Sequence, residues 1–275
     1  MSVPPDAAQT RAPDAAQTRA PDAAQTRAPD APLLGPVVLR LAQVEPDRDA
    51  IYRLVGVSPQ RPVHRRWIDL VETLLADLRR LMRPRAVYRI DRVDALAPRR
   101  VVLTSGVTFE GAIGQFLKHS TMMATYVATI GSAVERLSRA WLKAGKVMQG
   151  AIADAIASES AEAVAQAVQD AVRAWARARG CDVTPRYSPG YCGMTVRQQI
   201  PLFAMVPAER INVRITPSCL MLPVKSTSGL IGIGPADKVA PGGYPCEACI
   251  HPDCMQRRAP TNPAFARCAC EPAES

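Results

Sequence analysis

The chain has 275 residues, enough for one large domain or two small ones, and its hydrophobic fraction of 48% is ordinary for a protein that buries a core. The formal net charge is +9, and no run of 18 uncharged apolar residues is present, so no membrane-spanning helix is expected. The N-terminus lacks a basic segment followed by an apolar stretch, which argues against a secretory signal and makes the cytoplasm the expected location.

The N-terminal segment repeats the sequence PDAAQTRA, with copies that begin at Pro5, Pro13 and Pro21 and a truncated copy at Pro29. A proline at every eighth position stops helix propagation, and the repeat holds no large apolar side chain to bury. We therefore expect residues 1–34 to be a disordered tail that precedes a folded domain.

Residues 61–82 place apolar side chains at helical intervals, which predicts an amphipathic helix. Residues 86–93 and 101–107 have the composition of strands, and residues 121–130 that of a buried strand. A further helix is predicted over residues 132–144.

Residues 147–179 form an Ala-rich stretch without proline, which predicts one long helix that ends at Gly180. Asp154, Ser158 and Glu162 recur every four residues and so lie along one stripe of that helix. Their spacing alone favours a solvent-facing stripe.

After Gly180 the chain is broken by prolines, with strand-like runs at residues 211–215 and 230–233. We expect loops and short strands that wrap over the long helix. Functional sites are commonly built from such segments.

Residues 186–193 read RYSPGYCG. Pro189 and Gly190 favour a tight turn, because proline presets φ and glycine accepts positive φ. Such a turn exposes backbone amides and directs Arg186 and Tyr191 to its two sides. An arginine there can hold a carboxylate through a bidentate pair, although the isolated pattern is more typical of a structural turn with a surface arginine.

Residues 215–229 read ITPSCLMLPVKSTSG and continue into a glycine-rich LIGIG run. Glycine- and hydroxyl-rich loops can cradle phosphate. However, no GK[ST] follows and the spacing of a dinucleotide fingerprint is missing, so nucleotide-phosphate binding is excluded.

The two motifs, in this order, resemble the activation domain of cobalamin-dependent methionine synthase. They read R-x-x-P-G-Y and, about twenty-five residues later, T-x-S-x-x-M-x-P-x-x-S-x-S-G; the SAEA run at residues 160–163 also resembles that family. The resemblance extends from about residue 130 to residue 234, and more loosely from residue 37. It implies an α+β fold in which a twisted antiparallel sheet is flanked by helices, including the long Ala-rich one, and it implies a site for S-adenosylmethionine.

Residue by residue, the resemblance implies that Arg186 holds the methionine carboxylate of the ligand and that Glu162 contacts its ammonium group. The turn Ser188-Pro189-Gly190 would supply backbone contacts. Tyr191 would lie toward the corrin ring and is the one candidate catalytic residue. Where the family has a ligand-contacting tyrosine, this chain has Val239, and Tyr244 is a candidate substitute.

The reaction implied is the one-electron reduction of an inactive cob(II)alamin, followed by capture of cob(I)alamin with the sulfonium methyl group. The chain lacks the D-x-H-x-x-G signature of a cobalamin carrier. Its cobalamin is therefore expected on a partner, a methionine synthase or another corrinoid protein, with a flavodoxin- or ferredoxin-like protein as electron donor. On this interpretation the chain is a free-standing, methionine synthase-related enzyme, the activation component of a methyltransferase.

Five of the eight cysteines lie in the last thirty residues, so we expect residues 35–240 to form the domain and residues 241–275 a separate Cys-rich segment. Cys246, Cys249 and Cys254 are close enough in sequence to share one metal, and thiolates suit an iron–sulfur cluster or zinc. A fourth ligand could be Cys192, Cys268 or Cys270. The cysteine-rich segment thus has three interpretations: it binds an iron–sulfur cluster, it binds zinc, or it binds no metal.

Two other functions compete with the activation role. The chain is alternatively a non-catalytic metal-binding interaction module of a corrinoid methyltransferase system, in which the ligand site has decayed. The basic charge also permits nucleic-acid binding, but an ordinary solvated surface explains it better, so we expect neither nucleic acid nor membrane as a partner.

Overall fold

The computed structural model describes residues 32–56, 65–191 and 193–239, together with the single residues 246, 257, 259 and 260. Its centre is a seven-stranded sheet in the order β4-β3-β2-β5-β9-β6, with β1 paired to the first half of β2. All pairings in this sheet are antiparallel. The strands are β1 (Leu34–Arg40), β2 (Arg85–Ala97), β3 (Arg100–Leu103), β4 (Thr108–Glu110), β5 (Met122–Thr129), β6 (Cys181–Tyr187) and β9 (Ser226–Pro235).

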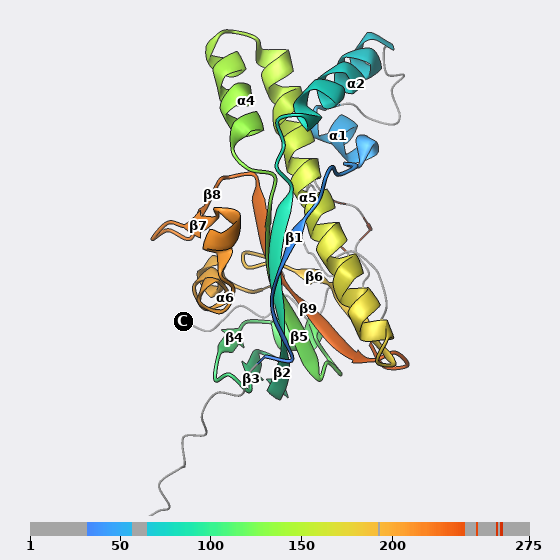
Figure 1. Cartoon of the computed structure of the whole chain (residues 1–275), viewed down its shortest axis with the longest axis vertical. Coiled ribbons are helices and arrows are strands. Elements are labelled where there is room, and N and C mark those ends of the chain that lie inside the picture. Colours follow the sequence, from blue (N-terminus) through green and yellow to red (C-terminus); the bar gives the residue numbers. More distant parts are fainter. Residues whose placement is uncertain are drawn as a thin grey trace, which may run out of the picture.

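Helices cover both faces of the sheet (Figure 1). The α-helices are α1 (Arg48–Leu54), α2 (Arg65–Arg79), α3 (Ile113–Phe116), α4 (Ala133–Lys143), α5 (Val147–Arg177) and α6 (Gln199–Met205). The smaller elements are the 3-10 turns η1 (Val196–Gln198) and η2 (Ala208–Ile211) and a two-stranded ribbon of β7 (Arg214–Ile215) and β8 (Met221–Leu222). The α+β architecture with an antiparallel sheet, flanking helices and one long Ala-rich helix is thus confirmed.

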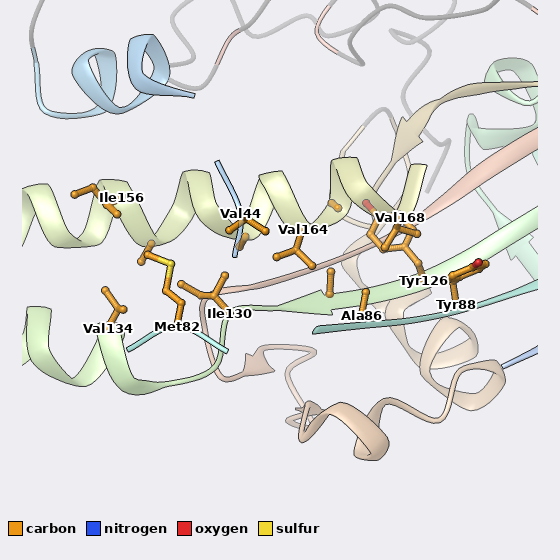
Figure 2. Close-up of a cluster of buried hydrophobic side chains, with 14 of the residues drawn as sticks. Val44, Met82, Ala86, Tyr88, Tyr126, Ile130, Val134, Ile156, Val164 and Val168 are labelled. Carbon is orange, nitrogen blue, oxygen red and sulfur yellow. The ribbon is translucent and has the colours of Figure 1, made fainter. Parts of the chain in front are cut away.

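The sheet separates two hydrophobic clusters, as the alternation of side chains along a strand requires. Tyr126 on β5 belongs to the cluster under α5, together with Val164 and Val168 of that helix; Figure 2 shows these residues between α5 and the sheet. Its neighbours Met123 and Val127 belong to the opposite cluster, which α3, α6 and η2 complete.

The helix α5 forms as the sequence predicts, and the chain leaves it at Gly180, whose φ of +72° suits glycine. Near its N-terminus Gly150 lets α4 approach closely, because an added Cβ there would lie 2.6 Å from Cγ of Leu142. The hydroxyl of Ser138 on α4 donates to the Gly150 carbonyl at 2.9 Å, which fixes the hairpin of the two helices.

The expected wrapping of residues after Gly180 over the long helix is wrong. Strands β6 and β9 enter the central sheet, while α6, η2 and the β7–β8 ribbon lie on the face opposite α5 (Figure 1). The run at residues 211–215 is a strand only at Arg214–Ile215, because Ile211 closes η2 and Asn212 is left-handed with φ of +58°. Among the described residues, no helix combines the length and the apolarity needed to cross a membrane.

Candidate functional site

A bulge in β6 directs Arg186 toward α5. Val183 faces α5, and strict alternation would send the side chain three residues later to the other face. The register between β6 and β9 shifts between Val183 and Arg186, around Pro185, which has no N–H to donate. At this irregularity the Gly232 amide of β9 donates its hydrogen bond to the hydroxyl of Thr184, at 2.9 Å. The extra residue therefore returns Arg186 to the α5 face.

The guanidinium of Arg186 is bound by three side chains on α5. Its Nη1 donates to Oε1 of Gln166 and to Oε1 of Gln169, each at 2.7 Å. Its Nη2 lies 3.5 Å from Oε2 of Glu162. The Arg186 side chain is only 14% exposed, whereas that of Glu162 is 43% exposed, so the carboxylate marks the solvent side of the group.

We call Arg186 and its three partners the Arg186 cluster. The prediction that Arg186 and Glu162 lie within reach of one amino-acid moiety agrees with this geometry. Gln166 and Gln169 were not among the predicted site residues, although their positions four and seven residues after Glu162 place them on the same helix face.

The polar stripe of α5 is more than a solvent-facing row. Asp154 pairs with Nζ of Lys225 at 2.8 Å, and Ser158 accepts from the same ammonium at 2.9 Å. Glu162 continues the stripe to Arg186. Each of the two cations comes from the sheet side, Lys225 from the residue before β9 and Arg186 from β6, so the stripe ties the helix to the sheet.

The predicted tight turn is present at Ser188–Tyr191. The Tyr191 amide donates to the Ser188 carbonyl at 3.1 Å, and Gly190 has a φ of +95°, as the third position of a type II turn requires. The turn is closed again by a bond from the Gly190 amide to the Met194 carbonyl at 2.8 Å. Tyr191 is 56% exposed at the tip, so its ring is accessible to a partner.

Tyr126, which sequence reasoning missed, adds a buried phenol to this region. Its ring is fully buried under α5, and its hydroxyl makes no hydrogen bond with any described residue. Burial raises the pKa of Tyr126 to about 12, with a further rise from Glu162, against lowering influences of Arg186 and of the Thr227 and Ser188 hydroxyls. The phenol therefore stays protonated at neutral pH, close to both charges of the Arg186 cluster.

Gly229 of the S-x-S-G motif makes room for that phenol. Tyr126 and Gly229 are direct partners across β5 and β9. A Cβ on Gly229 would lie 2.9 Å from both Cε1 and Oη of Tyr126 and 2.8 Å from the Tyr187 carbonyl oxygen. The glycine of the motif is thus explained by close packing against an aromatic ring.

Val239, where the resembled family has a tyrosine, is only 2% exposed and packs against Gly234. It is a core residue and presents no hydrogen-bonding group. Tyr244, its candidate substitute, lies outside the described residues.

The predicted metal ligands fall mostly outside the described part of the chain. Outside it lie three of the four predicted ligands, Cys192, Cys249 and Cys254, and the alternative ligands Cys268 and Cys270. Cys246 is described, but its neighbours in the sequence are not. Within the described residues no group of three His, Cys, Asp or Glu side chains could hold a metal ion. The metal site stays a prediction from the sequence.

The comparisons with known proteins bear on this geometry. Residues 112–239 match the profile of the family described as the vitamin B12 dependent methionine synthase activation domain. The match spans β5, α5, β6 and β9, and with them all four members of the Arg186 cluster. No curated protein sequence matches the chain.

Among solved structures, the chain is similar to the MetH reactivation domain bound to AdoHcy. The TM-score is 0.63 at 15% sequence identity, over 80% of this chain and 85% of that one. At this identity the likeness establishes a shared fold, and it reaches beyond the family match into the N-terminal elements of the sheet. Residues 112–239 are therefore similar to the activation-domain family of vitamin B12-dependent methionine synthase, and the chain shares the fold of the MetH reactivation domain.

Proposed function

We propose that this chain binds S-adenosylmethionine at the Arg186 cluster and uses it to re-methylate a cobalamin carried by a partner protein. The observation that carries the proposal is the pairing of Arg186 with Glu162, 3.5 Å apart at the edge of α5. The α-carboxylate and α-ammonium of a methionine moiety are likewise neighbouring opposite charges. A cation and an anion fixed side by side complement both at once.

The cluster is also arranged to keep the arginine in place. Two glutamine oxygens hold Nη1, so the guanidinium loses little freedom when a carboxylate arrives. Among the described residues, those two bonds and the contact with Glu162 leave Nε–H and one Nη2–H of Arg186 for a ligand. The adjacent turn adds the backbone of Ser188, Pro189 and Gly190, and it carries Tyr191 on the accessible side.

The reaction requires little acid–base chemistry from the protein. The corrinoid of the partner, once reduced by one electron, would attack the methyl carbon of the sulfonium, so that a cobalt–carbon bond forms and S-adenosylhomocysteine leaves with the electron pair of the broken S–C bond. The chain contributes position: Arg186 and Glu162 orient the amino-acid end so that the methyl group faces the partner. We propose that Tyr191, exposed on the turn, packs against the corrin ring.

Calorimetric titration with S-adenosylmethionine tests the binding step. Arg186→Met should abolish binding, because it removes the cation but keeps an unbranched side chain. Arg177→Met is the matched control: Arg177 also pairs with a carboxylate, that of Asp182 at 3.2 Å, but at the far end of α5. Equal binding by both variants, or no binding by the wild type, contradicts the proposal. A chain that binds metal but no S-adenosylmethionine would instead be the interaction module.

The transfer step has a separate assay. A cobalamin-binding methionine synthase domain, a chemical reductant and S-adenosylmethionine should give the visible spectrum of methylcobalamin faster when this chain is present. Tyr191→Ala should slow that conversion and leave the affinity for S-adenosylmethionine unchanged, because the ring is on the partner side of the turn. Full activity of Tyr191→Ala would remove the role given to this residue.

A further inference from the structure

The hydroxyl of Tyr126 is a buried polar atom beneath α5. The side chain is fully buried, and no described residue accepts or donates a hydrogen bond at Oη. A buried hydroxyl without a partner destabilises a folded protein, and such groups are rare unless something else satisfies them. Phenylalanine would fill the same space at no such cost, so the hydroxyl needs an explanation.

The surroundings of Tyr126 indicate what would satisfy the hydroxyl. The phenol lies close enough to Arg186 and Glu162 for both charges to act on its ionisation. The hydroxyls of Ser188 and Thr227 are near as well, but neither is placed to complete a hydrogen bond. Gly229 packs directly against Oη, because a Cβ at this position would lie 2.9 Å from the phenol oxygen. The hydroxyl is thus directed to the place where the Arg186 cluster meets the Ser188 turn.

We infer that Tyr126 donates a hydrogen bond to the carboxylate that Arg186 holds, and so selects ligands that keep the amino-acid carboxylate. This inference rests on the proposed function and adds a specificity-determining residue to it. The phenol is a donor at neutral pH, and a carboxylate has acceptor sites left after a bidentate arginine contact. Ser188 lies in the turn directly after β6, so a ligand bound at this turn would be beside the phenol.

The inference has two opposite consequences for Tyr126→Phe. Without ligand, the variant should melt at the same temperature as the wild type or a few degrees above it, because an unsatisfied hydroxyl is gone. With S-adenosylmethionine, its affinity should fall about tenfold or more, as expected for a lost hydrogen bond to a charged group. A side chain with a purely structural role would not produce this combination.

Decarboxylated S-adenosylmethionine is the matched ligand, since it lacks only the carboxylate. Calorimetry should show wild type and Tyr126→Phe binding it equally. An equal loss for both ligands, or no loss for S-adenosylmethionine while Arg186→Met loses binding, overturns the inference but leaves the proposed function intact. Absence of S-adenosylmethionine binding by the wild type overturns both.

A second measurement does not depend on the variant folding. With tyrosines labelled at the ring carbon that bears the hydroxyl, S-adenosylmethionine should shift one buried tyrosine resonance of the wild type, and the decarboxylated ligand should not. The resonance is assigned to Tyr126 by its absence in Tyr126→Phe. Identical spectra with the two ligands would overturn the inference.

Discussion

Gln169 on α5 accepts a hydrogen bond of 2.7 Å from Arg186 on β6, and the amide nitrogen of the same side chain donates to the Thr184 carbonyl at 3.0 Å. One buried amide therefore satisfies the backbone of the β6 bulge and holds the arginine that the bulge directs toward α5. The conformation of the strand and the position of the candidate ligand-binding group are coupled through this side chain.

Gln169→Leu should weaken both functions of that amide. The Thr184 carbonyl loses its donor and Arg186 loses one acceptor, and both groups are buried or nearly so. The free energy of unfolding should therefore fall by about 1–3 kcal/mol. The affinity for S-adenosylmethionine should fall with it, because the guanidinium is less firmly held. Denaturant titration and calorimetry measure the two effects.

Gln166→Leu is the matched control for this change. Gln166 also accepts from Arg186 at 2.7 Å, but it is exposed and its amide nitrogen contacts only the side chain of Asp170 among the described residues. Its loss should cost less than about 1 kcal/mol. Equal destabilisation by the two substitutions would show that Gln169 has no special position.

Gly229→Ala should damage the same region by overpacking. The new methyl group would meet the backbone of Tyr187 and the ring of Tyr126, neither of which can move away easily. Such a change typically costs about 1–3 kcal/mol, and it should also lower ligand affinity by displacing the phenol. Gly35→Ala in β1 is the control, since an added Cβ there meets nothing within 4 Å. Thermal melting that is unchanged in Gly229→Ala would contradict this account.

The sequence predicted the parts of the site that depend on local spacing. The four-residue period placed Glu162 on one stripe of a long helix, and Pro189-Gly190 predicted the turn, because both depend on neighbours in the chain. The resemblance to a known family then predicted that Arg186 and Glu162 contact the same ligand and so lie close together.

What the sequence did not reveal depends on pairing between distant strands. Tyr126 lies against Gly229 only because β5 pairs with β9 in a register that sets the two opposite each other, although more than a hundred residues separate them in the chain. Arg186 faces α5 only because β6 shifts register at Pro185. A proline within a strand-like run is a signal for such a bulge, and the run CDVTPRY was not recognised as a strand. The segment at residues 194–215 was placed on the wrong face for the same reason, since no local pattern tells which face of a sheet it covers.

The cysteine-rich segment gives a prediction independent of the Arg186 cluster. Anaerobically purified protein should contain iron and sulfide, or else zinc, bound by Cys246, Cys249 and Cys254. Cys249→Ser should remove the metal, because a structural site rarely tolerates the loss of one thiolate. Cys181→Ser is the control, because Cys181 begins β6 and its thiol lies 3.8 Å from the Arg179 carbonyl oxygen. Metal analysis that finds neither iron nor zinc in the wild type would leave the third interpretation, a segment without metal.

Alkaline pH should reveal the buried phenol without any ligand. Burial raises the pKa of Tyr126 to about 12 in the folded protein, whereas a tyrosine in the unfolded chain has a pKa of about 10. Between these values the unfolded chain releases the proton and the folded protein keeps it, so unfolding becomes more favourable as the pH rises. The free energy of unfolding should fall by about 1.4 kcal/mol per pH unit from this group alone, roughly 2–3 kcal/mol by pH 12.

Tyr126→Phe isolates that contribution, because every other titrating group is common to the two proteins. Tyr52 and Tyr88, whose pKa values are also raised by burial, cancel in the comparison. The difference in unfolding free energy between wild type and variant should be constant below pH 10. Between pH 10 and about pH 12 the unfolding free energy of the wild type should fall relative to that of the variant, and above pH 12 the difference should again be constant. Urea titrations at half-unit steps of pH measure it. Parallel curves across this window would mean that the Tyr126 hydroxyl is already accessible to water in the folded protein, and that it is not an isolated donor awaiting a ligand.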